Sequence, residues 1–132
     1  MSKQAVILIV DDDPDERAGL KTLLELKDLK VLEAENAEQC LNLLEGQHPD
    51  LLILDIMMER KNSGFALVYQ LHKDPELKKI PIILLSNLPN LVSELNPEKE
   101  ERYLPVVKFF AKPIAPELLY QEIERILGIS LS

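Results

Sequence analysis

The sequence predicts an α/β protein with a doubly wound, five-stranded parallel sheet and helices on both faces. Four mainly apolar runs, at residues 5–10, 51–54, 80–85 and 106–110, and a short, weak strand at 31–34 carry the first part of this prediction. Apolar runs without polar alternation are typical of strands buried on both faces. Segments with helical signals separate these runs, and such β-α alternation favours a parallel sheet with right-handed crossovers.

The composition indicates one compact domain, residues 1–132, that belongs in the cytoplasm. Apolar residues make up 46% of the chain and charged residues 29%, which is ordinary for a globular protein. The net charge of −8 disfavours nucleic acid or an anionic membrane as a partner. No signal peptide is visible, and no apolar run approaches the roughly 18 residues that span a bilayer. The single cysteine cannot form an internal disulfide.

The first two helices have start and stop signals. Asp13 is a good N-cap before Pro14, and Glu16 places an acid near the positive end of the same helix. Asn36 can cap the second helix, which we expect to end at Gly46. The predicted apolar faces of the two helices contain Leu20, Leu23, Leu24, Leu26, Ala37, Cys40, Leu41 and Leu44. Cys40 is therefore predicted to be a core residue.

The later elements are less regular. A third helix is predicted over about residues 64–73, and a last helix starts at Pro116 and stops at Gly128. Ala115 stands at the N-cap position of the last helix, where it cannot supply a capping oxygen. The segment 87–105 contains three prolines, so it cannot form a single regular helix. The apolar stripe of the last helix is predicted to be Leu119, Ile123, Ile126 and Leu127.

Polar residues follow four of the five predicted strands. These are Asp11, Asp12, Asp55, Ser86 and Lys112. Taken singly, an aspartate at a strand end is most often a turn residue, and a lysine is most often solvated. In an open parallel sheet, however, the carboxyl ends of the strands lie at one edge, where binding sites form. The sequence therefore predicts that these side chains meet in one pocket.

Such a pocket favours a divalent cation and a phosphoryl group. Crowded carboxylates repel each other unless a cation shares the site. Because the strand ends offer oxygen ligands without histidine or cysteine, Mg²⁺ is favoured over Zn²⁺. In this pocket Lys112 can neutralise phosphoryl charge, Ser86 can donate a hydrogen bond, and Asp55 can act as the nucleophile that forms an acyl phosphate.

At these residues the chain resembles the receiver domain of two-component response regulators over essentially its whole length. The matching motifs are an acidic pair, Asp11-Asp12, a phospho-acceptor, Asp55, a hydroxyl residue, Ser86, and a Lys-Pro pair that begins at Lys112. The resemblance implies the flavodoxin-like strand order 2-1-3-4-5. It also implies that Mg²⁺ contacts Asp12 and Asp55 directly, Asp11 through water, and the backbone carbonyl of Met57. Phe109 matches the switch aromatic of the family, which acts together with Ser86.

The expected function is that of a stand-alone, Mg²⁺-dependent phospho-acceptor. It would take phosphate on Asp55 from a sensor histidine kinase or a phosphotransfer protein and signal through a downstream protein of unknown identity. It would not be an enzyme beyond self-catalysed phosphotransfer and autodephosphorylation. One alternative is a receiver-like binding module that is never phosphorylated. Another is a phosphatase of the haloacid dehalogenase kind, to which Asp11-x-Asp13 is similar but for which the chain has no room for a cap domain.

Overall fold

The fold is a parallel sheet covered by helices, and the computed structural model describes residues 4–55, 63–86, 108–112 and 114–131. The strands are β1 (Val6–Val10), β2 (Lys30–Ala34), β3 (Leu51–Asp55), β4 (Ile82–Ser86) and β5 (Lys108–Ala111). All pairings are parallel, and the strands lie in the order β2-β1-β3-β4-β5. The predicted α/β class and the order 2-1-3-4 are confirmed, and β5 pairs with the outer edge of β4.

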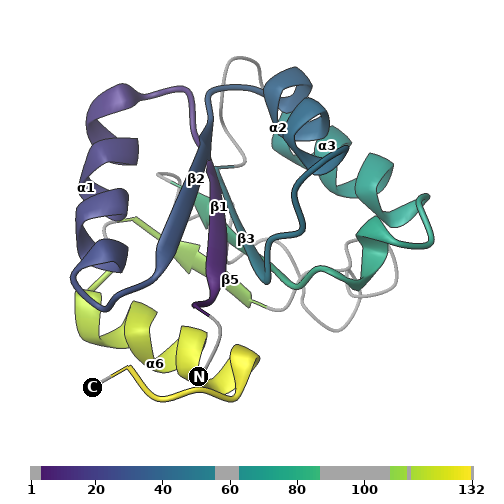
Figure 1. Ribbon diagram of the computed structural model, residues 1–132. Coiled ribbons are helices and arrows are strands. Elements are labelled where there is room, and N and C mark those ends of the chain that lie inside the picture. Colours follow the sequence, from purple (N-terminus) through teal and green to yellow (C-terminus); the bar gives the residue numbers. More distant parts are fainter. Residues whose placement is uncertain (1–3, 56–62, 87–107, 113, 132) are drawn as a thin grey trace.

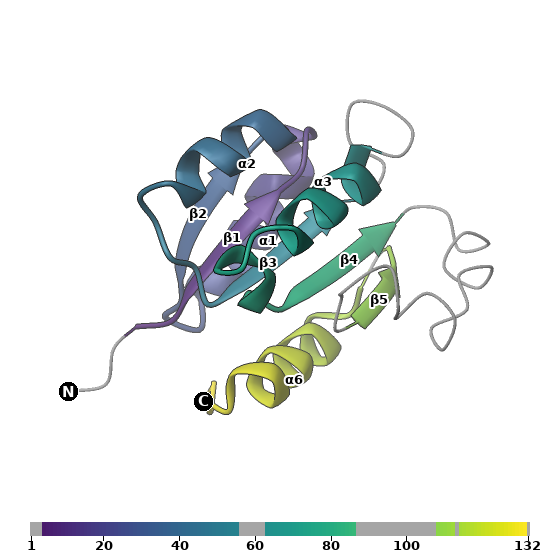
Figure 2. The same ribbon diagram turned by 90° about the vertical axis from the view of Figure 1, so that its right-hand side faces the viewer.

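Helices cover both faces of this sheet, as predicted (Figures 1 and 2). On one face lie α1 (Pro14–Glu25) and α6 (Pro116–Leu127), and on the other lie α2 (Ala37–Leu44) and α3 (Ser63–His72). A short 3₁₀ turn, η1 (Leu77–Lys79), leads into β4. The arrangement leaves the carboxyl ends of the strands together at one edge of the sheet.

The apolar runs form two cores because successive side chains of a strand point to opposite faces. In β1, Ile7 and Ile9 pack with α1 and α6, whereas Leu8 and Val10 pack with α2 and α3. In β3 every residue is buried. A strand between two helical layers has no solvent face, which explains why its sequence lacks polar alternation.

The predicted helix signals act as expected at several ends. The Asp13 side chain accepts hydrogen bonds from the backbone N–H groups of Asp15 (2.9 Å) and Glu16 (3.2 Å). Asn36 accepts one from the backbone N–H of Gln39 at 2.8 Å. Gly128 ends α6 in the left-handed conformation, with φ of 66°, a conformation that glycine adopts without steric penalty.

Three details of the predicted elements are wrong. Leu26 does not belong to the buried face of α1, because it is the C-cap residue and its exposed fraction is 72%. The second helix ends at Leu44, before Gly46. Ile80 is not part of the fourth strand: its backbone N–H donates to the carbonyl of Leu77 and closes η1, so the strand begins at Ile82. The prediction for residues 87–105 lies outside the described residues.

Cys40 is a buried core residue, as predicted. Burial raises the pKa of its thiol to about 12, because the thiolate would lose its hydration. The thiol therefore stays protonated and packs against Leu44 and the sheet as a small apolar group. Cys40 has a structural role only.

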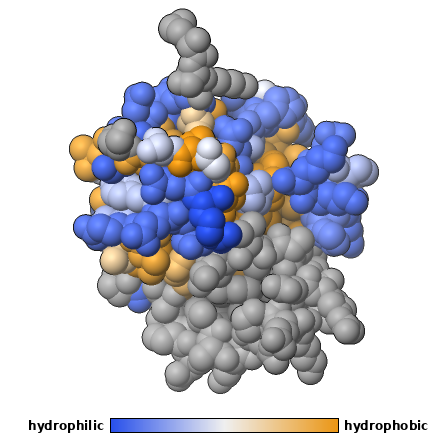
Figure 3. Space-filling model, turned by 90° about the horizontal axis from the view of Figure 1, so that it is seen from below, coloured by the Kyte–Doolittle hydropathy of each residue, from blue (hydrophilic) through white to orange (hydrophobic). Residues whose placement is uncertain are grey.

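The outer surface combines polar and apolar side chains. Seen from below, the described surface has hydrophilic groups with apolar groups between them (Figure 3). Leu26, Leu118 and Ile129 are the large apolar side chains with high exposure among the described residues. Within the same residues, no helix has both the length and the hydrophobicity that crossing a bilayer requires.

The uncapped start of α6 gives a first prediction. Ala115 is exposed, lies at the N-cap with extended backbone, and forms no side-chain capping bond. Replacing it by serine should raise the free energy of unfolding by about 1 kcal/mol, because the hydroxyl can accept a bond from an orphan N–H of the first turn. Urea denaturation measures this change, and Asp13→Ala, which removes the existing cap of α1, should lower stability by a similar amount. If Ala115→Ser did not raise the free energy of unfolding, the assignment of Ala115 as the uncapped N-cap of α6 would be contradicted.

Candidate functional site

The ends of β1 and β3 place two aspartates side by side at the edge of the sheet. Asp55 is the last residue of β3, and Asp11 directly follows β1, with its backbone N–H still paired to the carbonyl of Ala34 at 3.1 Å. Val10 lies opposite Leu54 in the register, so the residues that follow them, Asp11 and Asp55, come at the same edge of the sheet. Among the described residues, Asp11 and Asp55 are the two buried charged residues, with exposed fractions of 1% and 6%.

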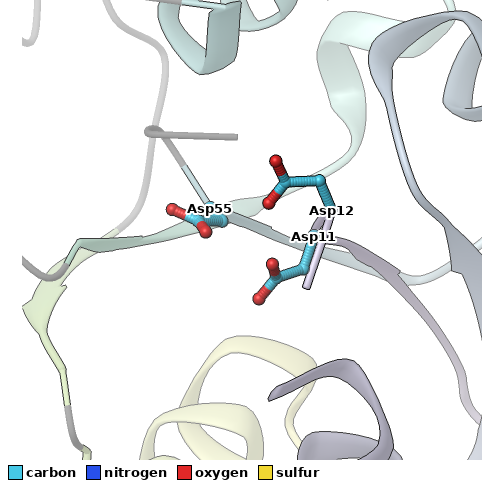
Figure 4. Close-up of side chains that lie close together, drawn as sticks. All are labelled: Asp11, Asp12 and Asp55. Carbon is cyan, nitrogen blue, oxygen red and sulfur yellow. The ribbon is translucent and has the colours of Figure 1, made fainter. Parts of the chain in front are cut away.

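Asp12 adds a third carboxylate to this pair. Oxygens of Asp11, Asp12 and Asp55 lie within 4.8 Å of one another, and Figure 4 shows the three side chains close together. Asp12 is exposed, so the cluster opens toward solvent on its side. The gathering of these three residues by the sheet, which the sequence predicts, is confirmed.

Lys112 directs its ammonium group into the same cluster from the end of β5. Its Nζ lies 3.2 Å from Oδ2 of Asp55 and 3.4 Å from Oδ2 of Asp11. The carboxylate of Glu16, which is outside the aspartate cluster, lies closer to the ammonium, at 2.6 Å from Nζ. The side chain of Lys112 is only 10% exposed, so these ion pairs are largely shielded from water. The predicted meeting of Lys112 with the acids is confirmed.

Two residues of α1 contribute to the site in ways that the sequence analysis did not anticipate. The sequence predicts for Glu16 only a place at the helix end, yet Glu16 makes the shortest ion pair of Lys112. Arg17 donates from Nη1 to the backbone carbonyl of Asp11 at 2.7 Å and pairs through Nε with Glu33 at 3.1 Å. Glu16 and Arg17 are close in sequence to the acidic pair, which could have indicated a role in the site. Sequence spacing alone, however, does not predict which strand end the side chain of a helical residue reaches.

The local backbone holds Asp11 in a fixed orientation. Its Oδ1 accepts the backbone N–H of Asp13 at 2.9 Å, and its Oδ2 faces the ammonium of Lys112. Both carboxylate oxygens therefore have partners within the protein. Because Asp13 also caps α1, the start of that helix and the buried carboxylate are parts of one hydrogen-bonded turn.

The electrostatics of the site favour cation binding. Burial raises the pKa of Asp11 to about 6, the charges of Asp55 and Glu16 act in the same direction, and the Asp13 bond and Lys112 only partly oppose them. Burial lowers the pKa of Lys112, but the hydrogen bond to Glu16 and the charges of Asp55 and Asp11 outweigh it and raise the pKa above its usual value. The lysine is thus firmly charged, and the acids still carry uncompensated negative charge.

The remaining predicted site residues are placed only by their backbone or not at all. Ser86 is the last residue of β4 and lies in register with Ala111, at the same edge as the acids. Phe109 belongs to β5, in register with Leu84. Met57 lies outside the described residues, so the predicted carbonyl ligand is not described.

The chemistry of the donors fits a hard divalent cation. The cluster offers carboxylate oxygens from Asp11, Asp12 and Asp55, and such oxygens are the usual protein ligands of Mg²⁺. The pKa of Asp11 is raised first by burial and further by the charges of Asp55 and Glu16, so a cation bound nearby would stabilise its charged form. Lys112 adds a fixed positive charge next to Asp55. Together these groups can bind a phosphoryl oxygen and a cation at the same place.

Comparison with known proteins identifies the family. The sequence matches the response regulator receiver domain over residues 7–124. It is 32% identical over 124 residues to protein PilH of Pseudomonas aeruginosa, covering 94% of this chain and 98% of PilH. Another relative is the probable transcriptional regulator ycf27 of Guillardia theta, at 32% identity over 121 residues. That alignment covers 92% of this chain but only 44% of ycf27, so the chain spans less than half of that relative.

A solved structure agrees with the sequence relatives. The fold is similar to that of response regulator protein TrrA from Thermotoga maritima, with a TM-score of 0.78 and 28% identity. The match covers 94% of this chain and 100% of TrrA, whose structure was solved in complex with Mg(2+)-BeF.

The buried state of Asp11 gives a second prediction, on pH dependence without metal. Since its pKa is raised to about 6 in the folded protein, the folded state holds the proton more tightly than the unfolded chain does. This stabilisation is complete below the unfolded pKa, about 4, and is lost as the pH rises through about 6. The wild type should therefore lose roughly 2 kcal/mol between about pH 4 and pH 7.5 from this group, and Asp11→Asn should not.

Urea denaturation in the presence of a chelator, repeated across this pH range, measures the effect. Asp15→Asn is the matched control, because Asp15 is exposed on the first turn of α1 and should leave the pH dependence unchanged. If the free energy of unfolding changed equally with pH in the wild type and in Asp11→Asn, the pKa of Asp11 would not be raised in the folded protein.

Proposed function

The chain belongs to the response regulator receiver domain family, and from this premise we propose that it accepts a phosphoryl group on Asp55 from a histidine kinase or a phosphotransfer protein. The observation that carries the proposal is the position of Asp55 at the end of β3. There it is buried, shares a cluster with Asp11 and Asp12, and lies 3.2 Å from the ammonium of Lys112. A nucleophilic carboxylate next to fixed positive charge suits phosphoryl transfer.

The transfer step is a displacement at phosphorus. A carboxylate oxygen of Asp55 forms the new bond to phosphorus while the bond from phosphorus to the donor's imidazole nitrogen breaks. The electron pair of the broken bond stays on the imidazole, and the product on the protein is an acyl phosphate. Because charge develops on the phosphoryl oxygens, positioned cations are the main catalytic contribution that such a site makes.

We propose that Asp11, Asp12 and Asp55 hold Mg²⁺ as the partner of this step. When bound, the ion supplies positive charge that balances the carboxylates and the incoming phosphoryl oxygens. The complex of TrrA with Mg(2+)-BeF supports this choice of metal. The carbonyl of Met57 is a further proposed ligand by the family likeness. We propose further that Asp12 and Asp55 would contact the ion directly and that Asp11 would act through water.

The other residues have roles that follow from their places at the sheet edge. Lys112 neutralises negative charge at Asp55 and binds a phosphoryl oxygen. Ser86, at the end of β4, is proposed to donate its hydroxyl to the phosphoryl group. Phe109, in β5, is proposed to be the switch aromatic that reports this change to a partner. Receiver domains are not conventional enzymes, and the reactions of this chain would be self-catalysed phosphotransfer and autodephosphorylation.

The setting we propose is a cytoplasmic two-component pathway. Residues 1–132 form one receiver domain in this proposal, and the match to PilH, which covers 94% of this chain and 98% of PilH, supports it. It would signal by contact with a downstream protein, with neither nucleic acid nor a membrane as its partner. The net charge of −8 supports the exclusion of nucleic acid.

A third prediction tests the acceptor directly. Incubation with acetyl phosphate and Mg²⁺ should add the mass of a single phosphoryl group to the intact protein, since a small donor can replace the kinase. Asp55→Ala should abolish the adduct while thermal melting shows a folded protein. An adduct that persists in Asp55→Ala but disappears in Asp11→Ala would move the nucleophile to the first strand and favour the phosphatase alternative.

A fourth prediction concerns Asp12, the exposed member of the cluster. Asp12→Asn should weaken Mg²⁺ binding by at least about tenfold, the lower end of what is lost when a group that supports a metal ligand is removed. Thermal melting without metal should show no loss of stability, because one of the crowded charges is gone. Calorimetric titration with Mg²⁺ measures the affinity, and Asp15→Asn should bind as the wild type does. A large drop in the metal-free melting temperature would instead assign Asp12 a structural role.

A further inference from the structure

The ammonium group of Lys112 is held most closely by Glu16. An ammonium has three N–H donors, and three carboxylates surround this one. Glu16 accepts at 2.6 Å, whereas Asp55 and Asp11 lie at 3.2 Å and 3.4 Å. Charge-assisted N–H···O bonds are typically about 2.7–2.9 Å long. The bond to Glu16 is therefore the strong one, and the two bonds into the acidic cluster are weak.

The surroundings of this pair strengthen it. Lys112 and Glu16 border a hollow of about 270 Å³ next to the cluster, on the α1 side of the sheet. The apolar walls of the hollow are Leu20, Leu23, Leu85 and Ile114. Since Lys112 is only 10% exposed and Glu16 is 36% exposed, water screens the pair incompletely. Asp13 caps the first turn of α1, so the backbone that carries Glu16 is also fixed.

Glu16 also changes the charge balance at the phosphorylation site. The three clustered carboxylates carry three negative charges, which the lysine and one divalent cation would cancel. Glu16 adds a further negative charge, and it reaches the cluster through the same ammonium that the phosphoryl group needs. Both effects oppose the binding of an anionic group at Asp55.

We propose that Glu16 is a positioning residue that draws Lys112 away from Asp55 and thereby limits how tightly the site holds a phosphoryl group. The inference rests on the proposed function, because it concerns the same acceptor. It assigns the first turn of α1 a part in setting the phosphorylation level.

The test uses beryllofluoride with Mg²⁺ as a phosphoryl analogue on the full chain. Glu16→Gln retains the shape and a hydrogen-bond acceptor but removes the charge, so its affinity for the analogue should rise roughly fivefold, the upper range for a partly exposed ion pair. Asp15→Asn removes the same charge from the same turn, and Asp15 takes no part in the ion pairs of Lys112. Its affinity should equal that of the wild type, as followed by ¹⁹F NMR of the bound fluorides.

A double-mutant cycle separates positioning from general charge. In a Lys112→Ala background, most of the gain from Glu16→Gln should disappear, because Glu16 acts mainly through the lysine and only the effect of its own charge would remain. An equal gain with and without Lys112, or no gain in the single variant, would overturn the inference. If the wild type bound the analogue and accepted phosphate while Glu16→Gln behaved as the wild type, the proposed function would stand and only the role of Glu16 would fail. A wild type that did neither would overturn both.

Discussion

The burial of two negative charges at the end of an apolar sheet is the constraint on which this site depends. A buried carboxylate is unfavourable unless a cation or hydrogen-bond donors compensate it. Lys112 provides this compensation from β5, although β3 and β4 separate β5 from β1 in the sheet. Its contact with Asp11 therefore joins two strands that do not pair. The ion pairs tie the outer strand to the centre of the sheet at the edge where chemistry can occur.

The single positive charge of Lys112 does not balance the negative charges of the clustered carboxylates. The resting site therefore has an excess of negative charge that a cation can neutralise. If the charges were fully balanced within the protein, a cation would gain little by binding. The cluster holds three carboxylates against one ammonium, so negative charge remains in excess, and Glu16 increases that excess while it competes for the lysine. Stability in the resting state is therefore exchanged for affinity toward a cation, as is common where a protein prepares a site for a charged ligand.

The sequence predicted the sheet and most of the site because the relevant signals are local. Apolar runs fix which segments are buried strands, and in a parallel sheet their carboxyl ends share an edge, so Asp11, Asp12, Asp55 and Lys112 had to converge. The sequence also predicted the N-cap of α1 at Asp13 and the C-cap of α6 at Gly128. The failures have long-range or competing causes. Ile80 is as apolar as a strand residue, but its N–H bonds back to Leu77, and the contact of Glu16 with Lys112 spans most of the chain.

The two members of the acidic pair differ in a way that only the structure shows. Asp11 has its Oδ1 bonded to the backbone N–H of Asp13 and its Oδ2 facing Lys112, whereas Asp12 is exposed at the open side of the cluster. A cation that came from solvent would reach the exposed Asp12, and it would have to compete with the lysine for Oδ2 of Asp11. The physical expectation is that Asp12 contributes a direct ligand and that Asp11 contributes mainly through its charge, which supports the division of roles proposed for the pair.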